Sequence, residues 1–187
     1  MRLFVAVVPP QEVVEHLAEF VEPRRDHPDE DLRWAATENW HVTLAFLGEV
    51  PDRKTEELEE RLERAAHRRP AMRLQIGGAG AFPNAAAARV LWTGVNGDRQ
   101  ALSRLATGAR AAANRAGVEV AGRRFTPHIT VARTRRPVDV TRWLRIFDSY
   151  AGPEWTADSI ELISSRLGQG ANRGSAYDSV GEWALLG

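Results

Sequence analysis

A five-residue pattern occurs twice in this chain of 187 residues, and it constrains the fold more than any other feature of the sequence. Residues 41–45 read HVTLA and residues 128–132 read HITVA. Apolar and β-branched residues that alternate with polar ones are typical of β-strands, in which alternate side chains leave on the same face. Each copy therefore predicts a strand that presents a histidine and a threonine on one face and apolar side chains on the other.

Alternation also predicts what lies beside each histidine. The next position on each polar face is an alanine, Ala45 or Ala132, which is too small to fill the space next to the imidazole. Two such strands facing each other would form a central cleft with paired imidazoles and paired hydroxyls. The candidate catalytic residues are His41, Thr43, His128 and Thr130.

Whole-chain composition narrows the class of protein. Lysine plus arginine and aspartate plus glutamate both total 25, so the formal net charge is zero, whereas proteins that coat long nucleic acids carry a basic excess. The absence of cysteine excludes disulfides and thiol nucleophiles. The apolar run at residues 3–8 is too short for a signal peptide or a membrane span. We expect a cytoplasmic protein without a membrane partner, and a monomer.

Strand and helix patterns alternate along the rest of the chain. The first strand, residues 3–8, is apolar throughout and is expected in the middle of a sheet. Charged residues and prolines predict a loop over residues 22–31, which include His27. Further strands are expected at residues 40–46, 72–82, 88–95, 159–167 and 176–185, and helices at residues 10–21, 52–66, 98–116 and 139–147.

The segments around the two motifs repeat an order of elements. Motif strand, short loop, helix and strand follow one another from Val42 to Phe82 and again from Ile129 to Leu167. The repeat predicts an α+β fold of two lobes related by a pseudo-twofold axis, with antiparallel sheets and outer helices around a central cleft. Residues 1–187 are expected to form one bilobal domain. The core face of the first motif strand is assigned to Trp40, Val42, Leu44 and Phe46.

The residue types in the predicted cleft suit acid–base chemistry on an anion. Histidine has an unperturbed pKa of ~6.5, so one copy can be neutral while the other is protonated, and the pair can act as general base and general acid. Threonine hydroxyls can donate to an oxygen whose negative charge rises during attack. Arg133 directly follows the second motif and is the arginine best placed to reach a phosphate. The same cationic patch contains Arg123, Arg124, Arg135 and Arg136, which fit solvated loop charges equally well.

Neither a metal ion nor an organic cofactor is predicted. The sequence shows no Asp, Glu and His cluster with metal-ligand spacing, so proton transfer would replace metal activation of water. The loop at residues 168–174 fits neither a P-loop nor a dinucleotide fingerprint. No serine stands in a nucleophile-elbow pattern, which makes a serine hydrolase the least suitable alternative.

Three stretches around these residues resemble a known family. Residues 2–6 (RLFVA), 40–48 (WHVTLAFLG) and 127–133 (PHITVAR) are similar to segments of the two-histidine (2H) phosphoesterase superfamily. The resemblance is to its bacterial and archaeal branch, the RNA 2′,3′-cyclic phosphodiesterases, also called 2′-5′ RNA ligases. It spans most of the chain, including the strand at residues 165–167 and the strand of Tyr177.

The resemblance implies a reaction and a role for each site residue. The reaction is metal-independent hydrolysis of a 2′,3′-cyclic phosphate end of RNA or an oligonucleotide to a 2′-phosphomonoester, with 2′-5′ ligation as its reverse. His128 would accept the proton of water, and His41 would protonate the departing 3′ oxygen. Thr43 and Thr130 would hold the non-bridging oxygens, and Arg133 would bind the substrate.

Two other functions are compatible with the sequence. A non-catalytic module that binds RNA ends would keep the cleft for recognition, although such a protein could replace either histidine with a fixed cation. A 2H enzyme that acts on a small cyclic or 2′-5′ nucleotide, or on an ADP-ribose derivative, would equally suit a chain without net charge.

Overall fold

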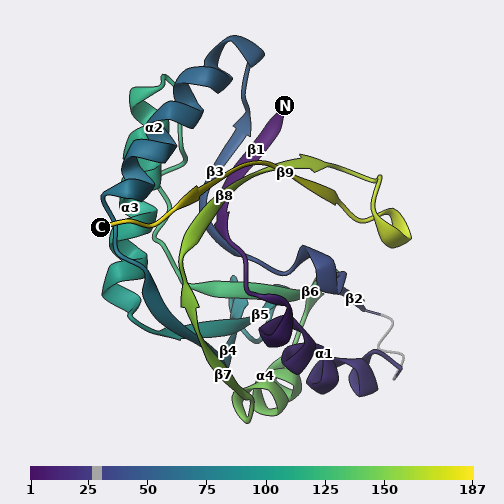
Figure 1. The fold of residues 1–187 in the computed structure, drawn as a ribbon. Coiled ribbons are helices and arrows are strands. Elements are labelled where there is room, and N and C mark those ends of the chain that lie inside the picture. The colour runs from purple at the N-terminus through teal and green to yellow at the C-terminus, as the bar shows by residue number, and fades with distance from the viewer. Residues whose placement is uncertain (27–30) are drawn as a thin grey trace.

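The computed structural model describes residues 1–26 and 31–187, and this part of the chain contains two antiparallel β-sheets and four α-helices (Figure 1). The predicted α+β class, with antiparallel sheets and outer helices, is confirmed. His27 lies outside the described residues.

The four-stranded sheet has the order β3–β1–β8–β9. Its strands are β1 (Arg2–Val7), β3 (Val42–Glu49), β8 (Ser159–Arg166) and β9 (Ala176–Ala184). β1 pairs with β3 on one side and with β8 on the other. The first apolar run therefore lies in the middle of a sheet, as its composition predicts.

The five-stranded sheet has the order β2–β6–β5–β4–β7. Its strands are β2 (Leu32–Trp34), β4 (Met72–Phe82), β5 (Ala88–Gly97), β6 (His128–Val138) and β7 (Ala151–Ala157). The second motif begins β6, whereas the first motif belongs to the other sheet, with His41 directly before β3. β3 and β6 contact each other, so the two motifs meet where the sheets meet.

The helices cover the outside of the two sheets (Figure 1). They are α1 (Gln11–Arg25), α2 (Thr55–His67), α3 (Arg99–Arg115) and α4 (Thr141–Asp148), with short 3-10 helices η1 (Thr37–Asn39), η2 (Asp52–Lys54) and η3 (Ala171–Arg173). α2 and α3 pack against each other along one flank. α1 and α4 meet through Phe20 and Phe147, whose ring centroids are 5.4 Å apart.

Several elements differ from the prediction, and β2 was not among the expected strands. The loop predicted from residue 22 is wrong in its first part, because α1 continues through Pro23 to Arg25, whose Nη2 donates to the Ala35 carbonyl at 2.9 Å. β7 was not predicted, because Gly152 and Pro153 are typical of loops. A proline is accommodated in β7 because this strand lies at the edge of its sheet.

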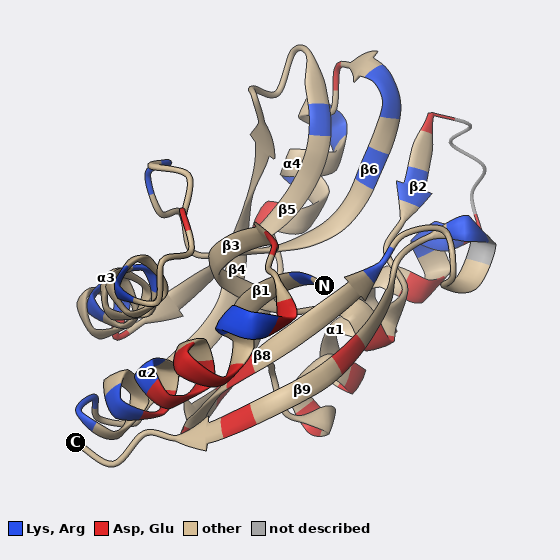
Figure 2. Ribbon diagram, turned by 90° about the horizontal axis from the view of Figure 1, so that it is seen from above, with Lys and Arg blue, Asp and Glu red and all other residues tan. Residues whose placement is uncertain are grey.

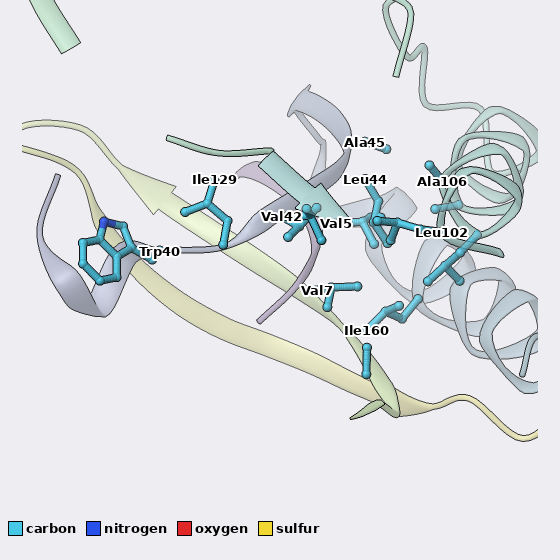
Figure 3. Close-up of a cluster of buried hydrophobic side chains, with 14 of the residues drawn as sticks. Val5, Val7, Trp40, Val42, Leu44, Ala45, Leu102, Ala106, Ile129 and Ile160 are labelled. Carbon is cyan, nitrogen blue, oxygen red and sulfur yellow. The ribbon is translucent and has the colours of Figure 1, made fainter. Parts of the chain in front are cut away.

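A β-bulge interrupts the first motif strand directly after its threonine. Thr43 and Ala45 lie opposite consecutive residues of β1, so Leu44 is an extra residue in β3. A bulge moves the following side chains to the other face of the strand. Ala45 is therefore buried beside Leu44 (Figure 3), and Phe46 is 60% exposed on the side of His41. The core assignment of Phe46 and the space predicted at Ala45 are both wrong.

The second motif strand is interrupted in the same place. Thr130 and Ala132 lie opposite consecutive residues of β5, so Val131 is the extra residue. Ala132 is buried in the core and Arg133 is exposed. The space predicted at Ala132 is wrong for the same reason, and the bulge turns Arg133 toward the face of His128.

The core faces of both motif strands join one hydrophobic cluster. The predicted core residues Trp40, Val42 and Leu44 are buried in it together with Ile129 of the second motif (Figure 3). Residues of both sheets and of all four helices contribute to this cluster. The two histidines are therefore held by strands whose opposite faces are closely packed.

The bulge in β6 predicts the response to a larger side chain at Ala132. This residue is fully buried and pairs with Trp34 of β2, so we expect Ala132→Leu to lower the free energy of unfolding by about 1–3 kcal/mol through overpacking. Chemical denaturation measures the change. Phe46→Leu, at an exposed position, is the matched control and should change it by less than about 1 kcal/mol. A stable Ala132→Leu protein would contradict the bulge.

Candidate active site

The first histidine is oriented by the turn that precedes its strand. The carbonyl oxygen of Asn39, at the end of η1, lies 2.7 Å from Nδ1 of His41. Because a carbonyl oxygen only accepts, Nδ1 carries the proton and Nε2 of the neutral imidazole is an acceptor. The Thr43 hydroxyl lies 2.8 Å from Nε2 and therefore donates to it. His41 and Thr43 thus form a hydrogen-bonded pair.

Strands β1 and β9 add aromatic side chains around His41. The ring of Phe4 lies 4.6 Å from the imidazole, and the ring of Tyr177 meets it edge-on at 5.4 Å. Asn39 also fixes the beginning of β9, since its Nδ2 donates to the carbonyl of Ser175 at 2.8 Å. One residue, Asn39, therefore holds both the imidazole and the segment that leads to Tyr177.

The second histidine is held in the same way. Nδ1 of His128 donates to the carbonyl oxygen of Thr126 at 2.6 Å, again two residues earlier in the chain. Phe82 of β4 and Trp92 of β5 lie 5.0 and 5.6 Å from the imidazole. Nε2 of His128 makes no hydrogen bond to the residues that the structure describes, so its lone pair is available to accept a proton.

A glycine explains the position of the Trp92 side chain. Gly80 of β4 lies directly opposite Trp92 in the β4–β5 register. A Cβ at Gly80 would collide with the indole ring, so the glycine lets this ring lie across β4 and against His128. The sequence did not assign Trp92, Phe4, Phe82 or Tyr177 to the site, because these residues reach the histidines only through strand pairing. The glycines of β4 are the one signal in the sequence.

Burial and positive charge keep both imidazoles neutral. Burial lowers the pKa of His41 to about 4, the carbonyl of Asn39 partly opposes this shift, and electrostatic interactions with His128 and Arg133 add to it. The pKa of His128 is also lowered, first by burial and then by Arg133, while the carbonyl of Thr126 opposes the shift. The effect of His128 on His41 agrees with the contact between β3 and β6, which carry the two motifs.

Thr130 and Arg133 complete the second half of the site. Thr130 is half-buried on the same face of β6 as His128, and Arg133 is exposed beyond the bulge. The charge of Arg133 contributes to the lowered pKa of both histidines. His41 and Thr43 are hydrogen-bonded to each other, and His128, Thr130 and Arg133 share one face of β6, a strand that contacts β3. The other arginines of the predicted cationic patch lie apart from these contacts. Nε and Nη2 of Arg136 donate to the two carboxylate oxygens of Asp31 at 3.1 and 3.2 Å, and Arg123, Arg124 and Arg135 are exposed.

Metal-ligand clusters and membrane-spanning helices are both absent from the described part of the chain. Within residues 1–26 and 31–187, no three His, Asp or Glu side chains are grouped so that they could hold a metal ion. No helix in these ranges is both long enough and apolar enough to cross a membrane.

The lowered pKa of His41 predicts a pH-dependent stability. The unfolded chain binds this proton with a pKa near 6.5 and the folded chain with a pKa of about 4. The unfolded state therefore holds more protons between these values, and the contribution is fully present above about pH 6.5. We expect it to fall by about 3 kcal/mol as the pH drops to 4. Denaturant unfolding of wild type and His41→Gln at a series of pH values measures this loss. Relative to His41→Gln, the wild type should lose this amount of free energy of unfolding between about pH 7 and pH 4. A difference between the two proteins that does not change with pH would contradict the lowered pKa.

Two anchored histidines, each two positions before a threonine and on facing sheets, are the arrangement expected of a two-histidine phosphoesterase. The sequence pattern of the LigT like phosphoesterase family matches residues 7–92 and 94–171, and the chain belongs to this family. The resemblance drawn from the motifs is therefore confirmed.

Relatives and solved structures cover nearly the whole chain. The RNA 2′,3′-cyclic phosphodiesterase of Escherichia coli is 34% identical over 190 residues, covering 98% of this chain and 96% of the relative. The protein of the same name from Thermus thermophilus is 32% identical over 196 residues, covering 100% of this chain and 91% of the relative. The crystal structure of TT0787 from Thermus thermophilus has a TM-score of 0.79 at 29% identity, covering 100% and 99%. E. coli LigT complexed with 3′-AMP has a TM-score of 0.78 at 29% identity, covering 100% and 98%.

Proposed function

We propose that this chain hydrolyses 2′,3′-cyclic phosphate ends of RNA to 2′-phosphomonoesters without a metal ion, acting as one bilobal domain and as a cytoplasmic monomer. The observation that carries the proposal is the pair of imidazoles, each anchored at Nδ1 and each held by one of two motif strands that contact each other across the sheets. The names of the relatives and the 3′-AMP complex of E. coli LigT support the choice of substrate class.

His128 is the general base in this proposal. Its Nε2 lone pair is free of other hydrogen bonds to described residues, and its lowered pKa keeps that lone pair unprotonated at neutral pH. As water attacks the phosphorus atom, Nε2 accepts the proton of the water and a new P–O bond forms. The Thr126 carbonyl accepts the Nδ1 proton throughout, which stabilises the imidazolium that results.

His41 is the general acid. The negative charge of a bound cyclic phosphate favours protonation of Nε2 and so opposes the burial that lowers the pKa of His41. Once Nε2 carries a proton, the Thr43 hydroxyl no longer donates to it and can turn to a non-bridging oxygen. When the P–O3′ bond breaks, Nε2 gives its proton to the 3′ oxygen, which leaves a 3′-hydroxyl and a 2′-phosphomonoester.

Thr130 and Arg133 stabilise the charge that builds up on the phosphoryl oxygens. A hydroxyl and a guanidinium on the same face of β6 supply a neutral and a charged donor beside the base. Ligation uses the same groups in the same roles, with a 5′-hydroxyl in place of water. His128 accepts the proton of the 5′-hydroxyl as the new P–O bond forms, and His41 protonates the 3′ oxygen as the P–O3′ bond breaks, which gives a 2′-5′ bond and a 3′-hydroxyl.

A substrate panel in the presence of a chelator tests this function. The panel contains an oligoribonucleotide with a 2′,3′-cyclic phosphate end, a 3′,5′-cyclic nucleotide and a 2′-5′-linked dinucleotide. We expect turnover of the first, with ³¹P NMR identifying a 2′-phosphomonoester as product. Tight binding of the cyclic end without product would favour a non-catalytic RNA-end-binding module, and preference for a small cyclic or 2′-5′ nucleotide would favour the other alternative.

A further inference from the structure

We propose that Arg33 of β2 forms, beside Arg133, a second phosphate subsite that binds the phosphodiester one nucleotide upstream of the cyclic end. The inference rests on the proposed function for the placement of the cyclic phosphate, and it goes further by naming the residue that contacts the phosphodiester upstream of the cyclic end.

The register of β2 and β6 places the two arginines side by side. Arg33 lies directly opposite Arg133, and Trp34 lies opposite Ala132. Directly opposite residues of an antiparallel pair project from the same face, with Cα atoms about 5 Å apart. Trp34 packs on Trp143 of α4, with ring centroids 5.2 Å apart, so the Trp34–Ala132 pair occupies the core face. Arg33 and Arg133 therefore occupy the other face, which also carries the second motif.

The charges of these two arginines are not neutralised by neighbours. Both side chains are exposed, and neither forms an ion pair with the described residues. By contrast, Arg136 near the end of the same strand is held by both carboxylate oxygens of Asp31. Like charges directly opposite each other in a sheet are destabilising. A phosphate between or beside the two guanidiniums would remove that repulsion and satisfy their donors.

The position of β2 gives a nucleotide chain a way out of the site. β2 is the edge strand of its sheet, next to β6, so no further strand lies beyond Arg33 in the described part of the sheet. Figure 2 shows basic positions on β2 and β6, whereas acidic positions gather on α2 and β9. A strand whose cyclic end lies between the histidines thus meets Arg133 first and Arg33 next. This order matches consecutive phosphates on the 5′ side of the cyclic end.

Two substrates that differ by one phosphodiester test the subsite. Adenosine 2′,3′-cyclic phosphate has no upstream phosphate, whereas the dinucleotide ApA with a 2′,3′-cyclic phosphate end has one. We expect Arg33→Gln to raise KM for the dinucleotide about tenfold, because a charged hydrogen bond is lost. The kcat for the dinucleotide should not change, and neither should kcat or KM for the mononucleotide. The slope of log kcat/KM against log salt concentration for the dinucleotide should become shallower by about 0.7.

Two further variants separate charge from fold. Arg33→Lys keeps the charge but not the planar fork, so we expect a smaller rise in KM for the dinucleotide than with Arg33→Gln. Arg104→Gln removes an exposed arginine on α3, in the outer helical layer, and should change kcat and KM for neither substrate. If Arg33→Gln raised KM equally for both substrates, or for neither, the result would overturn the subsite.

A binding measurement keeps this test separate from that of hydrolysis. Calorimetric titration with adenosine 2′-phosphate and with ApA ending in a 2′-phosphate needs no turnover. We expect wild type to bind the dinucleotide more tightly and Arg33→Gln to lose about tenfold of that advantage. If wild type binds both ligands but hydrolyses neither cyclic substrate, the proposed hydrolysis is wrong. The ratio of the affinities for the dinucleotide and the mononucleotide still shows whether Arg33 binds the upstream phosphate. An unchanged ratio in Arg33→Gln would contradict the subsite.

Discussion

Replacement of either His41 or His128 by alanine is expected to lower kcat for a 2′,3′-cyclic-ended oligonucleotide by at least about 10²-fold, because each variant removes one proton transfer of the reaction. Loss of both histidines should cost little more than loss of one, since the two groups act in the same step. Steady-state assays in the presence of chelator measure these rates. The His67→Ala variant, on the outer face of α2, is the matched control and should retain the wild-type rate.

The pH profile then separates the roles of the two histidines. A general base must be unprotonated and produces the acidic limb of a bell-shaped profile, whereas a general acid produces the alkaline limb. We therefore expect residual activity of His128→Ala to lose the acidic limb and that of His41→Ala to lose the alkaline limb. The opposite pattern would exchange the roles. Folded variants with near wild-type rates would refute the two-histidine mechanism.

Replacement of Arg133 by glutamine has the next largest expected effect. We expect kcat/KM to fall by about 10²-fold, because the phosphoryl oxygens lose a charged donor in the transition state. The pKa values of His41 and His128 should both rise, since the charge of Arg133 lowers them in the wild type. The acidic limb of the pH profile should therefore move to higher pH. NMR titration of the imidazole protons measures the same change directly.

Arg104→Gln is again the matched control for Arg133→Gln, since Arg104 is exposed and lies on α3. It should alter neither kcat/KM nor the histidine titrations. An Arg133→Gln protein with reduced activity but unchanged histidine pKa values would show that Arg133 acts at a distance from the imidazoles. Unchanged activity would remove Arg133 from the site.

The histidines and threonines of the site could be predicted from the sequence because they precede the irregular part of each motif strand. Alternation is exact from His41 to Thr43, and His41 and Thr43 do form a hydrogen-bonded pair. Alternation fails from Leu44 onward, because the bulge is set by pairing with β1 and not by the motif itself. Phe46, assigned to the core by parity, is exposed for this reason.

Features that depend on strand pairing could not be predicted from one sequence. Arg133 was predicted from its place next to the motif, but the bulge in β6 is what turns it to the site. The aromatic rings around the imidazoles come from neighbouring strands, as Trp92 does through its contact with Gly80. β7 contains Pro153 and forms a strand only because β4 leaves an edge free for it.

The central claim is that the two imidazoles flank one phosphorus atom. A crystal structure of the protein with a nucleoside 2′-monophosphate tests it most directly. We expect the phosphate oxygens to lie within hydrogen-bond distance, about 3 Å, of Nε2 of both His41 and His128, with the Thr43 hydroxyl turned from His41 to the phosphate. A phosphate bound elsewhere, or one that only a single imidazole can reach, would contradict the claim.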